Sequence, residues 1–290
     1  MIFLVGHKST ASGLRQMYLY VTMLREVKAR GELSRHVESY WSSDGKQLVL
    51  IPDGTFNVVF SAGCLLLSDG TVLQPGGHLI PIIKKKLVIK TSGFVAGIRF
   101  KAFSKRKFSD ELDAQNISVI STLEGRQLIT EHFTRSLIKE PDLFYLLPEV
   151  EEMAYELISH DMEINEDFRA KVNYILDRKG NIKVSELCEH FGISRQALHK
   201  QFIQNIGISA KDLAGIWRLN YFLTLIKSDF NLTEGLLEAG FFDQSHGIKI
   251  FKERLGDAPM NFLKNYPEIA ESEVARMIKR FNNYYDPDLT

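Results

Sequence analysis

A group of polar side chains stands at the front of a short basic segment near the end of the chain. Asp243 is suited to cap the first turn of a helix. Three polar residues follow it directly: Gln244, Ser245 and His246. Apolar and basic residues then recur at helical spacing: Ile248, Phe251 and Leu255 with Lys249, Lys252 and Arg254. Amide, hydroxyl, imidazole and ammonium groups hydrogen-bond base edges and phosphates, so this segment has the chemistry of a nucleic-acid contact.

A second copy of this segment lies earlier in the chain. The stretch "GISRQALHKQFIQNIGISA" (192–210) aligns with "FFDQSHGIKIFKERLGDAP" (241–259) at an offset of 251 − 202 = 49 residues. Similar residues then coincide: Ser194 with Asp243, Lys200 with Lys249, Phe202 with Phe251 and Gly207 with Gly256. A short helical pattern precedes each copy, so helix-turn-helix motifs are predicted at about 184–206 and 232–256. The second helix of such a motif enters the DNA major groove with its N-terminal residues toward the bases, which explains the polar front.

The segment between the two copies, 208–228, predicts a helix that is buried on several sides. Its apolar residues cover most of the helix circumference: Leu213, Ile216, Trp217, Phe222, Leu223, Leu225 and Ile226. About 19 central residues span roughly 28 Å at about 1.5 Å per residue. That length is close to the roughly 34 Å between successive major-groove faces. One linker helix can therefore hold two recognition helices on one side of a DNA duplex.

The N-terminal part of the chain has a strand pattern instead. From about 47 to 103, short apolar runs alternate with Asp-Gly, Pro-Gly-Gly and Ser-Gly turn signals, which predicts an antiparallel sandwich or barrel. A helical segment, 15–29, leads into it, and helical spacing resumes from about 117. The predicted fold class is α+β: a β-rich sandwich or barrel with flanking helices, followed by an all-α domain of two helix-turn-helix motifs joined by a linker helix.

Four segments are predicted along the chain. They are a β-rich domain at 1–135, a helical connector at 136–164, the two-motif helical domain at 165–266 and a C-terminal extension at 267–290. The extension predicts one more helix, to about Asn282, with an apolar stripe: Ile269, Val274, Met277, Ile278 and Phe281. We expect that stripe to pack on the adjacent helices rather than on a second copy or another partner.

Composition excludes several classes of protein. The chain has 290 residues, 44% of them hydrophobic, and 36 basic residues balance 36 acidic ones, as in a soluble protein of two domains. Two distant cysteines, Cys64 and Cys188, predict neither a disulfide framework nor a zinc cluster. The start "MIFLVG" lacks the basic front of a signal peptide and no apolar run spans a bilayer, so we expect a cytoplasmic protein without membrane contact. No paired histidines or triad spacing supports a metal, a cofactor or an enzyme.

The residues in and around the two motifs resemble the AraC/XylS family of transcriptional regulators. The resemblance covers about 165–266 and rests on "GIS" before the first recognition helix, "F…G-I-S-A" after it, Arg218 in the linker and "GF-x-DQSH…FK…G-x-x-P" in the second copy. Over about 30–135, "HVESYW", "LIPDGTFNVVF" and "GIRFKAF" resemble, less specifically, the β-rich sensor domain of one branch of that family. "RFKAF" departs from the Arg-Phe-Arg-Pro-Gly usual in that branch, so the pocket that it borders is expected to differ.

The resemblance implies which side chains face the DNA. Base-edge contacts are expected from four residues on each recognition helix: Arg195, Gln196, His199 and Lys200, then Gln244, Ser245, His246 and Lys249. Gln can pair with adenine, and Lys with guanine acceptors. Phosphate contacts are expected from helix N-termini and from Ser194, Ser209, Lys211 and Lys252. No ligand-binding residue of the β-rich domain is assigned.

The resemblance also implies a function. We expect a bacterial, sequence-specific DNA-binding transcriptional regulator, an activator controlled through its N-terminal domain by a sensed signal or by dimerisation. The expected partners are double-stranded DNA, RNA polymerase, a small-molecule effector and a second copy of the chain. One alternative stays open: the β-rich domain is a small-molecule binding module or an enzyme, and the helical half docks a protein. Salt-dependent DNA binding separates the two.

Gly247 breaks the apolar pattern of the second recognition helix. The first copy has Leu198 at this place, and the family usually has a large apolar residue there. The chain instead has Leu236 where the family usually has a small residue. We expect the Leu236 side chain to fill the space left at Gly247, because a core tolerates exchanges that conserve its volume. A glycine inside a helix costs about 1 kcal/mol relative to Ala, so the second motif is expected to be the less rigid one.

Overall fold

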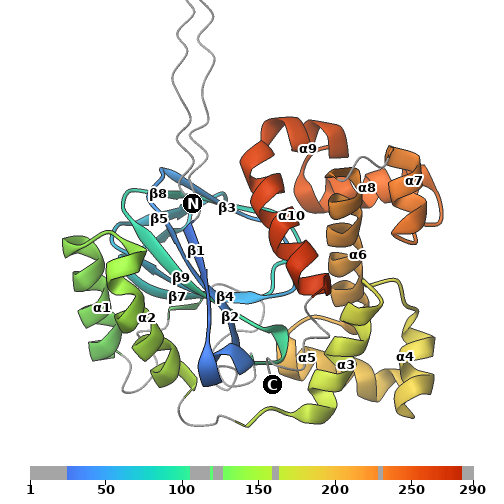
Figure 1. Cartoon of the computed structure of the whole chain (residues 1–290), viewed down its shortest axis with the longest axis horizontal. Helices are drawn as coiled ribbons and strands as arrows, with labels where there is room; N and C mark the ends of the chain where they lie inside the picture. Colours follow the sequence, from blue (N-terminus) through green and yellow to red (C-terminus); the bar gives the residue numbers. More distant parts are fainter. Residues whose placement is uncertain (1–24, 105–117, 120–126, 159–162, 228–230, 283–290) are drawn as a thin grey trace, which may run out of the picture.

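The computed structural model describes residues 25–104, 118–119, 127–158, 163–227 and 231–282 (Figure 1). A β-rich half, in blue and green, lies beside a helical half, in yellow to red. Of the helix predicted over 15–29, residues 15–24 lie outside the described chain, and Arg25–Lys28 form a strand, β1. That prediction is wrong for 25–28, because these residues pair with the edge of a sheet rather than with each other.

Two antiparallel sheets form the β-rich half, which confirms the predicted sandwich. The larger sheet has six strands in the order β1, β2 (Val37–Ser43), β9 (Val95–Phe100), β4 (Phe56–Ser61), β7 (Gly76–Ile80) and β10 (Ser118–Val119). The smaller sheet has four, in the order β3 (Gln47–Leu50), β8 (Leu87–Thr91), β5 (Leu65–Leu67) and β6 (Val72–Leu73). Trp41 and Leu48, one from each sheet, join the core between them. Trp41 lies over Gly97 of the neighbouring strand, where a Cβ would come within 2.1 Å of the indole.

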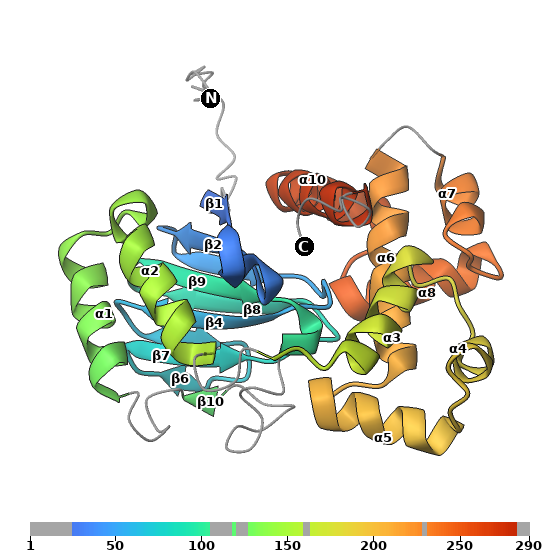
Figure 2. The same ribbon diagram turned by 60° about the horizontal axis from the view of Figure 1, so that its bottom comes forward.

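Two helices, α1 (Gln127–Lys139) and α2 (Leu143–Ile158), cover the outer face of the larger sheet (Figure 2). Side chains of β4 alternate between the two faces, as the pleat of a strand requires. Val59 belongs to the core between the sheets, whereas Val58 and Phe60 belong to the core under the helices. Phe60 meets Phe133 of α1 edge to face, with 4.8 Å between ring centres. A short 3-10 helix, η1 (Gly31–Arg35), connects β1 to β2.

The helical half is arranged around one long central helix, α6 (Ala210–Lys227). Its apolar side chains are buried on several sides, as predicted: Leu213, Ile216, Trp217, Phe222, Leu223 and Leu225. The other helices are α3 (Glu166–Asp177), α4 (Val184–Phe191), α5 (Arg195–Ile206), α7 (Leu232–Glu238), α8 (Gln244–Leu255) and α9 (Pro259–Asn265). Of these, α3, α5 and α7 pack directly on α6. Among the described helices, none has the length and apolar character that spanning a bilayer requires.

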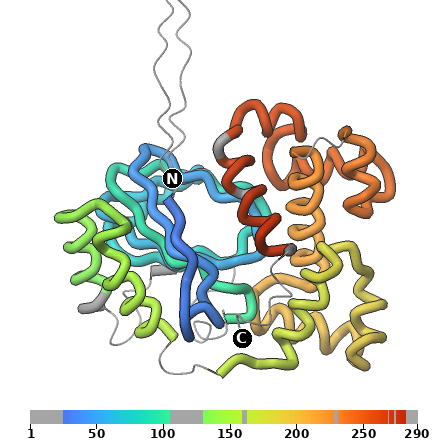
Figure 3. The backbone as a smooth tube through the Cα atoms, viewed as in Figure 1, coloured from blue at the N-terminus to red at the C-terminus, as the bar shows by residue number. Residues whose placement is uncertain are grey.

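A last helix, α10 (Pro267–Asn282), lies between the two halves (Figure 1, Figure 3). This helix, described as far as Asn282, confirms that a C-terminal helix follows the second motif, as predicted. Ile269 and Val274 are buried in one core with residues of α6, and Met277 is buried as well, so this part of the stripe packs on the adjacent helix, as expected. The prediction is wrong for Ile278, which is 39% exposed. The helix also reaches the β-rich half, which the sequence pattern did not indicate.

Removing residues 267–290 should lower the melting temperature by at least about 5 °C. The truncation strips buried apolar side chains from α6, each contributing about 1.5–3 kcal/mol. A change of 1 kcal/mol moves the melting temperature of a domain this size by about 2–4 °C. Circular dichroism melts compare the full and truncated chains, with a chain ending at 282 as the control. An unchanged melting temperature together with a smaller oligomer in solution would show that α10 serves a contact between copies instead.

Candidate nucleic-acid interface

The first helix-turn-helix is formed by α4 and α5. Gly192 ends α4 in the left-handed conformation (φ 61°), and the chain turns at once into α5. The Ser194 hydroxyl accepts a hydrogen bond from the Ala197 N–H at 3.2 Å, so it caps α5 as its place in the repeat predicts. Leu198 and Phe202 are buried beneath α5, which leaves the opposite side of this helix to solvent.

The second motif, formed by α7 and α8, follows the same plan. The Asp243 carboxylate accepts from the His246 N–H at 2.7 Å, which confirms the predicted cap. Phe251 and Leu255 are buried beneath α8. Gln244 contacts α7, because the Thr233 hydroxyl donates to its amide oxygen at 3.3 Å.

All eight predicted base-edge residues are exposed on the two recognition helices: Arg195, Gln196, His199 and Lys200 on α5, and Gln244, Ser245, His246 and Lys249 on α8. Three of the predicted phosphate residues are exposed as well: Ser194, Lys211 and Lys252. Ser209 is half-buried, and its hydroxyl donates to the Asp212 carboxylate at 2.8 Å. It also accepts the Asp212 N–H at 3.1 Å. Ser209 therefore caps α6 and faces an acid, which makes it the weakest of the four phosphate candidates.

Arg218 of α6 ties both motifs to the central helix. Its guanidinium donates to the Gly180 carbonyl at 3.0 and 3.3 Å and to the Gly240 carbonyl at 3.5 Å. Gly180 precedes α4, and Gly240 lies in the turn between α7 and α8, so one side chain holds both motifs in place. Burial lowers the pKa of Arg218, and the carbonyls replace the hydration that the guanidinium loses.

The predicted exchange of volume at Gly247 is confirmed. A Cβ at this position would lie 2.5 Å from Cδ2 of Leu236 and 3.2 Å from Cγ of Phe241. Leu236 is buried, so its side chain occupies the space that Leu198 fills in the first motif. Gly247 is therefore the residue that the packing of α7 against α8 requires.

A family model described as a helix-turn-helix domain matches residues 187–265, from α4 to the end of α9. This match takes in both motifs and α6 as one unit. Residues 187–265 of the helical half therefore form an AraC-type DNA-binding domain. The chain is therefore a DNA-binding transcriptional regulator, as the sequence led us to expect.

Solved structures of two regulators are similar to the chain at low identity. ToxT from Vibrio cholerae O395 is 12% identical with a TM-score of 0.44, over 78% of this chain and 97% of that one. Wild-type ToxT of Vibrio cholerae strain SCE256 with bound unsaturated fatty acid is 13% identical with a TM-score of 0.40, over 77% and 94%. The AraC-like transcriptional activator CuxR is 11% identical with a TM-score of 0.28, over 72% and 86%. These scores are too low to transfer any property of those proteins, and no curated protein matches the chain in sequence.

The β-rich half holds the second recognition helix of the AraC-type domain directly. The Lys86 N–H donates to the Arg254 carbonyl, in the last turn of α8, at 2.6 Å. In return, the Arg254 guanidinium donates to the Lys84 carbonyl at 3.3 Å. The Lys86 ammonium donates to Asp257 at 3.4 Å and to the Tyr266 hydroxyl at 3.1 Å. Sequence reasoning missed this contact, because a run of three lysines resembles an ordinary solvated loop.

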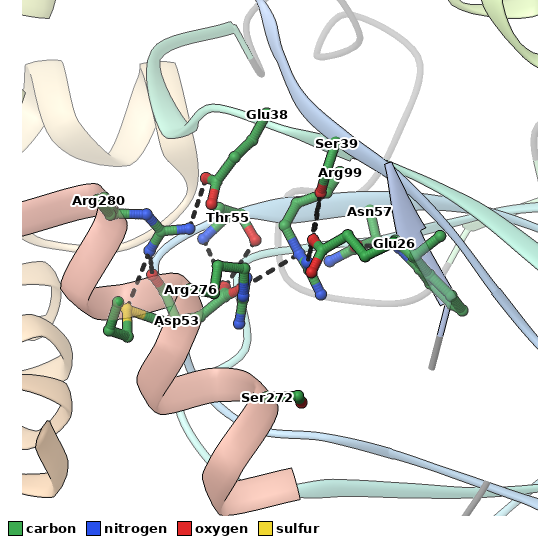
Figure 4. A network of polar contacts seen from close by, with 12 residues as sticks. Glu26, Glu38, Ser39, Asp53, Thr55, Asn57, Arg99, Ser272, Arg276 and Arg280 are labelled. Atoms are coloured by element: carbon green, nitrogen blue, oxygen red, sulfur yellow. Dashed lines mark hydrogen bonds and ion pairs between the residues drawn. The ribbon is translucent and has the colours of Figure 1, made fainter. Parts of the chain in front are cut away.

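A buried carboxylate of the β-rich half also holds α10 (Figure 4). Asp53, in the loop before β4, has a side chain that is 6% exposed. Arg276 of α10 donates to its Oδ2 at 2.5 Å, and Nε of Arg99 lies 3.4 Å from the same oxygen. The other oxygen accepts from the N–H and the hydroxyl of Thr55, at 2.8 and 2.6 Å. Burial alone raises the pKa of Asp53, but Arg276, Arg99 and Arg280 outweigh it and hold this pKa well below its usual range.

The main chain of Asp53 adds further bonds between the halves. Its carbonyl accepts from the Trp217 indole N–H of α6 at 3.1 Å and from Arg280 of α10 at 2.5 Å. Arg280 also donates to Glu38 of β2 at 2.5 Å. Three carboxylates therefore face three guanidiniums in this cluster: Glu26, Glu38 and Asp53 with Arg99, Arg276 and Arg280.

A cavity of about 700 Å³ lies beside this cluster, between the β-rich half and the AraC-type domain. Its charged lining is mainly basic: Lys28, Arg30, Lys101, Arg276, Lys279 and Arg280, against Glu26 and Glu38. Leu176 and Trp217 add apolar surface from α3 and α6. Burial lowers the pKa of Lys101, because desolvation disfavours its charged form, and an anion bound beside it would stabilise that charge. The volume lies in the range typical of small-molecule sites.

A double-mutant cycle tests the packing around Gly247. Gly247→Leu alone should destabilise the chain by about 1–3 kcal/mol, because its side chain overpacks against Leu236. Leu236→Ala alone should cost about 2–5 kcal/mol through a cavity. The two together should be less destabilising than the sum by at least about 1 kcal/mol, measured by urea unfolding.

Leu187→Ala supplies the control, because Leu187 is a buried leucine of the first motif. Its combination with Gly247→Leu should be additive. Additivity in both cycles would contradict the assigned packing, since residues in contact must couple.

Proposed function

We propose that the chain is a sequence-specific transcriptional activator that reads two successive major grooves and responds to a small organic anion. The main support is a pair of capped recognition helices with exposed polar fronts, held by one central helix of 18 residues. At about 1.5 Å per residue this helix spans about 27 Å, close to the roughly 34 Å between successive major-groove faces. The base-edge and phosphate residues expected from the sequence are the proposed contacts.

The basic cavity between the halves is the proposed effector site. An anion there would contact Lys101 of the β-rich half and Lys279 or Arg280 of α10, and so would change how the AraC-type domain is held. Within this proposal, 1–135 carries the signal, 136–164 connects, 165–266 binds DNA and 267–290 joins the two. RNA polymerase and a second copy of the chain are further proposed partners, in the cytoplasm and without catalysis.

Selection of duplexes from a random library tests the DNA-binding part. Two half-sites about 10 base pairs apart should emerge, with an affinity that falls steeply as salt rises. Gln244→Ala should weaken binding by about 1–3 kcal/mol and relax specificity at one or two base pairs of one half-site. Lys252→Ala should weaken binding to every duplex and lower the salt slope by about 1. Binding without sequence preference, or an unchanged preference in Gln244→Ala, would contradict the proposed register.

Thermal shifts with a panel of organic carboxylates and their neutral amides test the effector part. A carboxylate that binds the cavity should raise the melting temperature of the wild type, and its amide should not. Lys101→Gln should abolish the shift, because it removes a cation from the cavity wall. Lys90→Gln is the matched control, because Lys90 is an exposed lysine of β8 outside the cavity lining. Equal shifts with carboxylate and amide would count against an anionic effector.

A further inference from the structure

The turn of the second motif contains one residue more than the turn of the first. In both motifs the chain leaves the supporting helix through a left-handed glycine, Gly192 (φ 61°) or Gly240 (φ 79°). The residue after each glycine donates its N–H to the carbonyl five residues earlier, at 3.0 Å in both cases: Ile193 to Cys188, and Phe241 to Leu236. Ile193 and Phe241 are therefore equivalent by hydrogen bonding, although the offset of 49 pairs Ile193 with Phe242.

Phe242 is the additional residue. Ile193 is followed directly by the cap of α5, Ser194, whereas Phe242 stands between Phe241 and the cap of α8, Asp243. Phe242 is also 93% exposed, the highest value among the large apolar residues of the described chain. A single exposed apolar residue is ordinary on a protein surface, so exposure alone assigns no role.

The backbone on both sides of Phe242 is held in place. Phe241 is buried and meets Phe222 of α6 edge to face, with 6.1 Å between ring centres. Arg218 donates to the Gly240 carbonyl, and Asp243 is fixed by its bond from the His246 N–H. The exposed ring therefore extends from an anchored turn at the front of the recognition helix.

We propose that Phe242 reads DNA by packing against the C5-methyl group of a thymine in the second half-site. The N-terminal end of a recognition helix faces the base edges, and Phe242 lies one residue before the cap of that helix. Consecutive Cα atoms are about 3.8 Å apart, so its ring starts beside the polar front that begins at Gln244. Thymine presents an apolar methyl group in the major groove, and phenylalanine is among the side chains that contact it. This inference rests on DNA binding by the second motif and adds an apolar contact to the proposed polar ones.

Deoxyuridine substitution tests the proposed contact, because it removes only the thymine methyl group. Each thymine in the second half-site of the selected duplex is replaced in turn, and dissociation constants are measured at fixed salt. The wild type should lose about fourfold in affinity at one position, the factor that burying one apolar carbon is worth. Phe242→Ala should bind the thymine duplex at least about fivefold more weakly and lose nothing further when that thymine becomes deoxyuridine.

Leu237→Ala is the matched control, because Leu237 is an apolar residue of the same motif that is 60% exposed on α7. This variant should keep the wild-type response to every duplex, and melting temperatures should show that both variants fold. Unchanged affinity in Phe242→Ala would overturn the proposal and favour a protein partner for the ring. Equal weakening on all duplexes, with no thymine to which the wild type is sensitive, would overturn it in favour of a sugar–phosphate contact. A selected second half-site without thymine would overturn it as well.

Gln244→Ala, measured on the same duplexes, distinguishes a failure of the thymine contact from a failure of the proposed register. Loss of specificity in this variant supports the proposed register whatever Phe242 does. If Gln244→Ala is silent while Phe242→Ala loses the methyl response, the register fails and the thymine contact stands.

Discussion

A carboxylate buried between two halves of a protein has to be neutralised there, because the effective penalty for desolvating an ion amounts to several kcal/mol. The Asp53 carboxylate is neutralised by two guanidinium groups, those of Arg99 of β9 and Arg276 of α10, which both lie at its Oδ2. Replacing such clusters with apolar residues often leaves stability unchanged, so their effect is on geometry more than on energy. The directional bonds of the guanidinium groups set where α10 lies, and α10 in turn packs on α6, which carries both recognition helices. The ion cluster is therefore one of the contacts that set the orientation of the AraC-type domain, together with the bonds between α8 and the loop at Lys84 and Lys86.

The two recognition helices differ in their contacts with the β-rich half. The last turn of α8 forms two hydrogen bonds with the main chain of the loop at Lys84 and Lys86, so the β-rich half contacts the second recognition helix directly. Moving α8 relative to that loop has to break these bonds first. The second recognition helix is also the one with a glycine, Gly247, inside it. The helix that contacts the β-rich half is therefore the one that a glycine is expected to make less rigid.

Local physics explains which features could be predicted from the sequence. The spacing of residues within one or two helices is enough to predict three features. They are the two helix caps, the burial of α6 on several sides and the packing of Leu236 in the space at Gly247. Contacts between the halves could not be predicted, because Asp53 belongs to a Pro-Asp-Gly run that indicates only a turn. Its partner Arg276 lies 223 residues further on, and no periodicity connects positions so far apart. The sequence predicts a helix where β1 forms for a similar reason: the strand is set by its pairing with β2, and its four residues alone do not indicate that pairing.

The two motifs distribute side-chain volume differently beneath their recognition helices. In the first motif, three positions under the recognition helix carry Cys188, Ile193 and Leu198, a small, a medium and a large side chain. In the second, the equivalent positions carry Leu236, Phe241 and Gly247, and a Cβ at the glycine would crowd both of the others. In the second motif the large side chains therefore belong to the supporting helix and the turn, and the recognition helix has none at the equivalent position. Phe241 also anchors the turn, and one further residue, Phe242, separates it from the cap of α8. The larger Leu236 and Phe241 and the small Gly247 are therefore one matched set of packing positions.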